Sequence, residues 1–554
     1  MDIAERLKSV MRGEVSTTDA DLESASRDTS LFVRMPKAVA YPKDAEDVAS
    51  AVRAIADAKK AGEDVALAAR AAGTDMSGGP LTDSVVLSFT KHMQRIDDLE
   101  CDAECVAGTM WTEPGVYYRD FEKATIAKGL IMPSYPASRE LAAMGGIVAN
   151  DSGGEKTLAY GKTHDYVEEL EVVLADGTRT SFKALTKTEV AQKKLVDGLE
   201  GRIYRELDKL LSEHADVIET ARPKVSKNSA GYALWDVRTT DGGMNLAKLI
   251  AGSQGTLVLW TRAKLRLVKP KAHRAMLIVF LNEVPLLPEV VKRILPFSPE
   301  SFESYDDHTF TLAVKFLPEM LSQMGWTRAA RLGISFIPEA EMVLLGGVPK
   351  LVLMAEFAED TIEEADAKAE QARVALAGLD LKSHIEKDEA HSEKYWIVRR
   401  ESFRLLRKNL RGTYASPFID DFVVPTDSYD RFLPELHALL DEYKDSMVYT
   451  VAGHIGNGNF HIIPLMDLKN PEARTTVLEL APRVYDLVIR YGGTTTGEHN
   501  DGIIRTPYLE KLFGSEMVQL FQKTKTLFDP LNILNPGKKV GGTSEDIERF
   551  MIPG

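Results

Sequence analysis

The chain has 554 residues, too many for a single hydrophobic core, and this length predicts two or three domains. Hydrophobic residues make up 44% and charged residues 27% of the sequence, which is typical of a soluble globular protein. The formal net charge of −15 argues against nucleic acid or an anionic membrane surface as the main partner.

The N-terminal residues Met-Asp-Ile-Ala-Glu-Arg-Leu are acidic and lack the apolar core of a signal peptide. Apolar runs such as 275–281 are much shorter than the ~20 residues that a membrane-spanning helix needs. We therefore expect a cytoplasmic protein without a transmembrane segment, although peripheral contact with a membrane stays open.

The two cysteines, Cys101 and Cys105, lie in an acidic stretch. A single C-x3-C pair offers too few ligands for an iron–sulfur cluster or a zinc knuckle. We expect two free thiols in a reducing compartment. Any electrons that leave this chain must then pass to another molecule.

The predicted elements begin with a short helical arm over residues 1–30. Asp44 begins a helix in which Val48, Val52 and Ile55 share one buried face. Strands are predicted at 65–70, 84–89, 167–174, 255–260 and 264–268. Proline and charge at 269–272 indicate a domain boundary.

Strands and amphipathic helices alternate from residue 273 to residue 490. The clearest helix covers 361–379, with Asp360 or Thr361 as its N-cap and alanines facing inward. The tail from residue 491 has a glycine density typical of functional loops. The predicted division is therefore an arm at 1–30, domains at 31–270 and 271–490, and a C-terminal segment at 491–554.

Three loops of small residues occur within one 200-residue block, at 70–79, 144–154 and 251–256. Glycine lets backbone N–H groups approach a diphosphate, and paired glycines let the chain lie flat against a planar ligand. The first loop has neither the G-x-G-x-x-G fingerprint nor the P-loop lysine. Together the loops predict a bound cofactor of another class.

His454 and His461 lie on either side of a glycine-rich turn, and Glu498 and His499 follow about forty residues later. Two imidazoles and one carboxylate make a good divalent-metal set that leaves coordination open for a substrate. The remaining histidine titrates near neutrality and could take a proton from a metal-bound group. The pattern predicts metal-assisted chemistry on a small oxygenated molecule.

The three loops, in this order, resemble the FAD-binding domain of the vanillyl-alcohol oxidase/PCMH flavoprotein superfamily. The segment 70–75, Arg-Ala-Ala-Gly-Thr-Asp, is similar to its Arg-Gly-Gly-Gly-Thr-Ser loop, and 252–257 is similar to Gly-Ser-Glu-Gly-Thr-Leu. The segments 454–461 and 497–502 resemble its H-x-G-D-G-N-x-H and G-E-H-G-x-G motifs, with Asn457 and Asn500 in place of aspartate and glycine. Asparagine tolerates left-handed backbone, so both turns could be kept. Within the superfamily the chain resembles the group of D-lactate dehydrogenase, glycolate oxidase and D-2-hydroxyglutarate dehydrogenase over residues 30–540.

The resemblance implies an α+β fold. It makes 31–270 a PCMH-type FAD-binding domain with two subdomains, 271–490 a substrate or cap domain with an antiparallel sheet, and 491–554 a segment that returns to the FAD domain. The first loop has no histidine and the cysteines lie elsewhere, so we expect non-covalent FAD. The residues that would hold it are Arg70, Ala72, Gly73, Thr74, Asp75, Ser77, Pro133, Gly145, Gly146, Asn150, Ser152, Gly153, Gly154, Tyr160, Gly161, Gly255, Thr256, Leu257 and Asn535.

By the same resemblance His454, His461 and Glu498 would bind a divalent metal, with zinc favoured and manganese or iron as alternatives. Asn459 and His499 would face the substrate. Arg399 is similar to the arginine that holds the substrate carboxylate, and a guanidinium suits that task because it forms two parallel hydrogen bonds. Where the hydroxyglutarate enzymes carry a lysine, residues 418–421 offer two acids before Pro425.

These features together predict FAD-dependent oxidation of a D-2-hydroxy acid, such as lactate, glycolate or 2-hydroxyglutarate, to the 2-oxo acid. The metal would lower the pKa of the hydroxyl, His499 would remove its proton, and hydride would pass to flavin N5. The electron acceptor could be a quinone, a cytochrome, an electron-transfer flavoprotein or oxygen. A non-redox FAD transferase and a flavin-binding subunit without its own chemistry are the alternatives, and a homodimer is possible.

Overall fold

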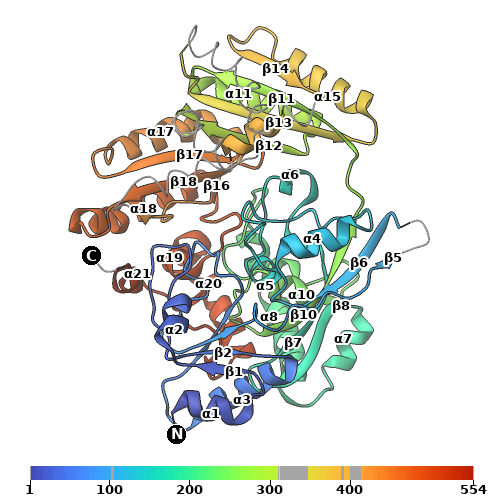
Figure 1. Ribbon diagram of the computed structural model, residues 1–554, viewed down its shortest axis with the longest axis vertical. Coiled ribbons are helices and arrows are strands. Elements are labelled where there is room, and N and C mark those ends of the chain that lie inside the picture. The colour runs from blue at the N-terminus through green and yellow to red at the C-terminus, as the bar shows by residue number, and fades with distance from the viewer. Residues whose placement is uncertain are drawn as a thin grey trace.

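The computed structural model describes residues 2–101, 105–307, 309, 311, 347–387, 392–399 and 414–552. The described residues form a lower body and an upper cap (Figure 1), and the two largest hydrophobic clusters lie mainly in one of them each. The part of the chain from 491 onward lies mainly in the lower body, where helices α19, α20 and α21 sit near the N-terminal elements (Figure 1). No helix among the described residues is long and apolar enough to cross a membrane.

The lower body contains two sheets. The four-stranded sheet has a parallel centre, in the order β1 (Glu14–Ser16), β2 (Ala38–Tyr41), β4 (Val85–Ser88) and β3 (Leu67–Arg70). The six-stranded sheet is antiparallel, in the order β5 (Glu100–Cys101), β6 (Ala107–Thr112), β10 (Leu259–Val268), β7 (Val167–Val173), β8 (Arg179–Leu185) and β9 (Met244–Asn245).

Helices pack around these two sheets. The helices of the lower body are α1 (Ile3–Val10), α2 (Asp19–Ala25), α3 (Ala45–Lys60), α4 (Tyr118–Ile126), α5 (Met144–Asn150), α6 (Thr157–Tyr160), α7 (Lys187–Lys193), α8 (Gly198–Glu213), α9 (Ala215–Ala221), α10 (Leu246–Ile250), α19 (Gly502–Arg505), α20 (Leu509–Phe528) and α21 (Ser544–Phe550). The Asp44 carboxylate caps α3, and Val48, Val52 and Ile55 are fully buried, as predicted.

The cap is built on an eight-stranded antiparallel sheet. Its strands are β14 (Lys382–Glu386), β11 (His273–Leu281), β13 (Leu351–Glu359), β12 (Ser301–Asp306), β17 (Val448–His454), β18 (Asn459–Met466) and β15 (Tyr414–Ala415), with β16 (Phe422–Val423) also paired to β18. The cap helices are α11 (Leu287–Ile294), α15 (Ile362–Ala375), α17 (Tyr429–Asp441) and α18 (Pro471–Arg490). Thr361 caps α15, whose Ala365, Ala369 and Ala372 face the core, so that prediction is confirmed.

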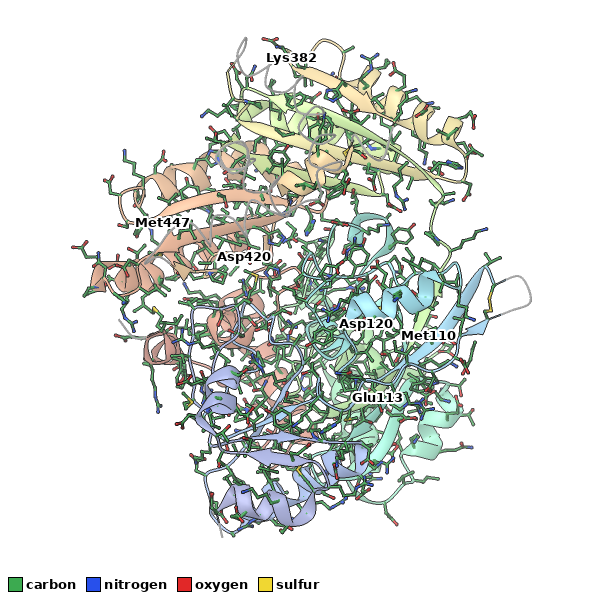
Figure 2. The ribbon with its side chains drawn as sticks, in the orientation of Figure 1. Met110, Glu113, Asp120, Lys382, Asp420 and Met447 are labelled. Carbon is green, nitrogen blue, oxygen red and sulfur yellow. A yellow bond between two sulfur atoms is a disulfide. The ribbon has the colours of Figure 1, made fainter. Side chains whose placement is uncertain are left out.

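The N-terminal residues form the helices α1 and α2, and they pack into the lower body, because β1 pairs with β2 and α1 packs on α3. Two local predictions need correction. The two strands predicted over 255–268 are one strand that begins at Leu259, because Gln254 and Gly255 have positive φ angles and cannot extend it backwards. Cys101 and Cys105 form a disulfide beside the β5–β6 hairpin (Figure 2), because the hairpin brings their Cα atoms to 5.2 Å, so the prediction of free thiols is wrong.

Candidate functional site

A cavity of about 470 Å³ lies between the lower body and the cap. Its floor consists of the three small-residue loops and its roof of cap strands, so it lies where the two bodies face each other. Besides the cofactor positions predicted from the sequence, the floor includes Thr29, Ala69, Ala71, Ala143, Ala149, Ser253 and Gln254. The roof is lined by Thr309, Arg399, Ala415, Thr450, Ala452, His454, His461, Ile463, Glu498 and His499.

The first loop follows β3 and is hydrogen-bonded to the N-terminal segment around residues 24–29. The Arg70 guanidinium donates hydrogen bonds to the backbone carbonyls of Ser24 and Arg27, which holds the N-terminal segment over the loop. Thr29 of that segment donates to the carbonyls of Thr74 and Asp75 and lines the cavity itself. The N-terminal residues therefore form part of the cofactor-side wall, which the sequence alone does not indicate.

Asp75 organises the loop from within. Its carboxylate accepts hydrogen bonds from the backbone N–H groups of Ser77 and Gly79, at 3.0 and 2.8 Å, and from the Asn150 side chain at 2.7 Å. These donors offset its charge, so the carboxylate ties the first loop to the second. Gln254 of the third loop joins the same network through Ser77 and Asn150.

The floor has room for a planar ligand. A Cβ built on Gly146 would meet no atom closer than the Ala71 methyl at 3.9 Å, so this glycine keeps the cavity open. A Cβ on Gly255 would likewise meet only carbons at 3.6 and 3.8 Å. Backbone that approaches a ligand closely requires such positions. The loops therefore fit the flavin and diphosphate of FAD.

Eleven of the nineteen predicted cofactor positions line the cavity. They are Arg70, Ala72, Gly73, Thr74, Asp75, Gly145, Gly146, Asn150, Ser152, Gly153 and Gly255. The other eight do not line it: Ser77, Pro133, Gly154, Tyr160, Gly161, Thr256, Leu257 and Asn535. Asn535, for example, is fully buried and donates to the carbonyls of Gly79 and Gln254, which joins the first and third loops.

Tyr160 does not line the cavity. Its hydroxyl donates to Glu300, just before β12 in the cap, at 3.0 Å. The phenol is therefore a contact between the two bodies, and its role in cofactor binding stays a prediction.

The β17–β18 hairpin brings together two of the predicted metal ligands. His454 ends β17, and His461 is the third residue of β18, across from Ala452. Because side chains two residues apart on a strand share a face, both imidazoles point to the same side of the sheet. Their Nε2 atoms lie 3.0 and 3.2 Å from a single oxygen, Oε1 of Glu498.

A buried carboxylate stands behind each of these rings. His454 Nδ1 lies 2.7 Å from Glu303 Oε1, and His461 Nδ1 lies 3.0 Å from Asp420 Oδ1. When a carboxylate accepts the Nδ1 proton, the Nε2 lone pair faces the opposite direction, here toward Glu498. The arrangement fits a divalent cation held by His454, His461 and Glu498.

Asp420 also reaches His499. Its second oxygen, Oδ2, lies 2.6 Å from His499 Nδ1, and the rings of His461 and His499 stack with centroids 5.1 Å apart. Asp420 has no exposed surface and lies near the junction of the two bodies (Figure 2). One carboxylate therefore orients a candidate metal ligand and a candidate base, and the acids of 418–421 gain a role that the motif comparison missed.

Asp421 explains why Glu498 and His499 can serve one site. Its Oδ2 accepts hydrogen bonds from the backbone N–H groups of Glu498, at 3.0 Å, and His499, at 2.7 Å. These two bonds, with a third from the Thr496 hydroxyl, bend the chain. Asn500 follows with a φ of 68°, so the prediction that asparagine keeps this turn is confirmed.

Among the described residues, one group of four has ligand atoms that all lie within 4.8 Å of one another: Asp421, His461, Glu498 and His499. It shares His461 and Glu498 with the predicted set but does not include His454. Asp421 already holds the backbone bend, so its use as a ligand would cost those hydrogen bonds. His454 has no such competing duty at Nε2. The set of His454, His461 and Glu498 therefore stays our prediction.

The electrostatics of this cluster follow from its burial. Burial lowers the pKa of His461, but Asp420 and Glu498 outweigh it and raise the pKa to about 10. For His499 too, burial is outweighed by the carboxylates of Asp421 and Asp420, and the pKa is raised above its usual range. Burial opposes ionisation of Glu498, yet Lys227 and the two histidines hold its pKa well below the ordinary value.

Arg399 and Asn459 are placed differently from each other. Arg399 lines the cavity, with one guanidinium nitrogen 3.3 Å from Glu303, so it can reach a ligand there. Asn459 is fully buried across from His454 in the hairpin, and its amide donates to Asp421 at 3.0 Å and accepts from Lys227 at 3.4 Å. Its side chain does not line the cavity, and a role toward the substrate stays a prediction.

Two family models match the chain. The one described as an FAD binding domain matches residues 36–183, and the one described as the C-terminal domain of FAD linked oxidases matches residues 270–539. The first range contains the loops at 70–79 and 144–154, and the second contains the histidine and glutamate cluster. FAD binding by this chain is supported by these domains.

Curated relatives match nearly the whole chain at low identity. D-2-hydroxyglutarate dehydrogenase of Pseudomonas putida is 28% identical over 95% of this chain and 50% of its own length. Glycolate oxidase subunit GlcD of Bacillus subtilis is 26% identical, over 92% and 90%. D-lactate dehydrogenase of Archaeoglobus fulgidus is 28% identical over 91% of each chain. The chain spans about half the length of several of the hydroxyglutarate dehydrogenases that it matches.

Solved structures share the fold. 4-Ethylphenol oxidase from Gulosibacter chungangensis superposes with a TM-score of 0.68 and 16% identity, over 98% of this chain and 97% of the other. Alkyldihydroxyacetonephosphate synthase gives a TM-score of 0.64 at 14% identity, over 96% and 84%. At these identities the likeness concerns the fold alone. With the two family models it confirms the predicted fold class, in which an FAD binding domain is joined to the C-terminal domain of FAD linked oxidases.

Proposed function

We propose that this protein oxidises a D-2-hydroxy acid to the corresponding 2-oxo acid. The observation that carries the proposal is the position of His499, His454, His461, Glu498 and Arg399 on one wall of the cavity whose opposite wall is formed by the FAD-side loops. The relatives are named for D-2-hydroxyglutarate, glycolate and D-lactate, and all three are 2-hydroxy acids. The proposal takes from those names only the shared hydroxyl and carboxylate.

Arg399 is the group proposed to bind the substrate carboxylate. Its guanidinium is permanently charged and can donate two parallel hydrogen bonds to a carboxylate. Ala415, Ala452 and Ile463 line the same cavity, together with the polar side chains of Thr309 and Thr450.

His499 is proposed to accept the hydroxyl proton at Nε2. Its Nδ1 is held by Asp420, which fixes the ring and stabilises the imidazolium that forms. Within the described part of the chain, Nε2 makes no hydrogen bond, and the residue lines the cavity. When bound, FAD supplies the acceptor for the two electrons and the α-hydrogen, and a divalent cation lowers the pKa of the hydroxyl.

Zinc is the cation we favour at His454, His461 and Glu498, because two imidazoles and one carboxylate are a common ligand set for it. Manganese and iron remain the alternatives. The FAD is proposed to be non-covalent. A quinone, a cytochrome, an electron-transfer flavoprotein or oxygen is predicted to reoxidise it. The homodimer, the cytoplasmic location and the domain limits also stay predictions.

The test is an anaerobic visible spectrum of the purified protein during titration with D-2-hydroxy acids, with metal analysis on the same sample. We expect one acid to bleach the flavin band near ~450 nm, chelation to abolish the bleaching and Zn²⁺ to restore it. A flavin spectrum that no acid changes, in a sample that retains its metal, would contradict the proposal.

A further inference from the structure

Glu303 lies between the candidate metal centre and the candidate carboxylate clamp. It is in β12, which pairs with β17 so that Ser304 lies across from Gly453. In an antiparallel pair the next positions in register are Glu303 and His454. The sheet itself therefore brings this carboxylate beside the histidine.

The carboxylate of Glu303 uses both oxygens. Oε1 lies 2.7 Å from His454 Nδ1, and Oε2 lies 3.3 Å from a terminal nitrogen of Arg399. The residue is only 1% exposed, so water cannot substitute for either partner. Burial of an unpaired carboxylate is strongly unfavourable, so this position is tolerated because two donors meet it.

The two contacts act on different parts of the site. Acceptance of the Nδ1 proton leaves His454 Nε2 as the lone-pair nitrogen directed at Glu498. The contact with Arg399 fixes one end of the guanidinium, while its Nε is buried without a hydrogen-bond partner among the described residues. Arg399 also lines the cavity, so its guanidinium can meet an anionic ligand there.

Asp420 offers a parallel. Asp420 contacts both the candidate metal ligand His461 and the candidate base His499. In the same way, Glu303 contacts both the candidate metal ligand His454 and the candidate carboxylate-binding residue Arg399. Both carboxylates are buried, and each reaches a different histidine of the β17–β18 hairpin.

We propose that Glu303 is a positioning residue that fixes His454 for metal binding and Arg399 for substrate-carboxylate binding at the same time. The substrate half of this inference rests on the proposed function, whereas the metal half does not. Loss of Glu303 then weakens two properties that are normally measured separately, metal affinity and KM.

The test uses the full-length FAD-bound protein with Glu303→Ala, Glu303→Gln and Arg399→Gln. Glu300→Gln is the matched control, because Glu300 is also a buried carboxylate beside β12 but contacts Arg274 and Lys156. Zn²⁺ affinity is measured by competition with a chromophoric chelator, and kcat and KM are measured with the acid that reduces the flavin. The flavin spectrum and the melting temperature report whether each variant folds.

We expect Glu303→Ala to lower Zn²⁺ affinity about 10- to 100-fold and to raise KM roughly tenfold or more. In Glu303→Gln the amide oxygen can still accept from His454, so Zn²⁺ affinity should fall less. KM should still rise, because the amide no longer holds the Arg399 guanidinium through an ion pair. Arg399→Gln should raise KM and leave Zn²⁺ affinity unchanged. Glu300→Gln should change neither.

Unchanged Zn²⁺ affinity in folded Glu303→Ala and Glu303→Gln would overturn the inference, as would a wild-type protein that binds no Zn²⁺. A rise in KM without any change of metal affinity would overturn it too, because the two effects are proposed to share one cause. If the wild type binds Zn²⁺ but oxidises no hydroxy acid, the proposed function fails. A weakened Zn²⁺ affinity in Glu303→Ala would then still support the metal half.

Discussion

Asp420 is the residue whose replacement tests the site most sharply. Its two oxygens accept from His461 Nδ1 at 3.0 Å and from His499 Nδ1 at 2.6 Å, and the side chain has no exposed surface. Asp420→Asn keeps the shape but offers one acceptor oxygen in place of two. Its NH₂ group would face an Nδ1–H group, so one of the two rings must lose its hydrogen bond or change tautomer.

The size of the effect follows from that lost contact. A hydrogen bond to a charged group contributes about 1.5–3 kcal/mol, and about 1.4 kcal/mol corresponds to tenfold in rate. If the bond to His499 is the one lost, kcat/KM should fall roughly 10- to 150-fold. A second effect concerns pH. Burial lowers the pKa of His499 and the neighbouring carboxylates, Asp420 among them, raise it, so removal of one carboxylate lowers this pKa.

The assay is anaerobic stopped-flow reduction of the flavin by the hydroxy acid across the pH range, with metal content measured on each sample. A base must be neutral to act, so kcat/KM should rise with pH through the pKa of His499. In Asp420→Asn this rise should move to lower pH while the rate on its plateau decreases. An unshifted rise together with a wild-type rate would refute the role of Asp420. Asp427→Asn, an exposed change in the same segment, is the control.

Three other replacements probe the base, the cofactor cavity and the fold. His499→Ala should abolish turnover while the flavin spectrum is retained, and full activity would exclude it as the base. Gly146→Leu should lower FAD affinity by more than about tenfold, measured by flavin release, because its side chain would enter open cavity space. Burial lowers the pKa of His164, but Asp151 outweighs it and raises the pKa to about 10. The charged imidazole therefore stabilises the folded protein fully below pH ~6.5, and this stabilisation is lost as the pH rises through about 10. His164→Gln should therefore lower the free energy of unfolding by about 1–3 kcal/mol at pH 6 and by less near pH 10, in denaturant titrations; equal losses at both would contradict this.

The three cofactor loops could be predicted from sequence because their information is local. Small residues after a strand and paired glycines mark a close approach of backbone to a ligand wherever the segment lies. The motif at 454–461 is local in the same way, because a hairpin places residues of one face together without any distant partner.

The supporting carboxylates could not be predicted, because each acts across a long stretch of chain. Glu303 lies 151 positions before His454, and Asp420 lies 79 before His499. No spacing rule links such pairs, since the strand order of the cap sheet decides which segments meet. The sequence shows Asp420 as an acid near Pro425. Only the fold shows that it is a hydrogen-bond partner of two histidines.

The segment 496–502 connects the cap cluster to the cofactor loops. Asp421 of the cap holds its bend, while Asn500 donates from its side chain to the carbonyls of Asn150, at 3.1 Å, and Gly252, at 2.9 Å. A glycine at position 500 could adopt the same positive φ but could not form these two bonds. The asparagine that departs from the family motif thus joins the turn that carries Glu498 and His499 to the second and third loops. Because both bodies hold this segment, it helps to fix the position of His499 relative to the loops of the lower body.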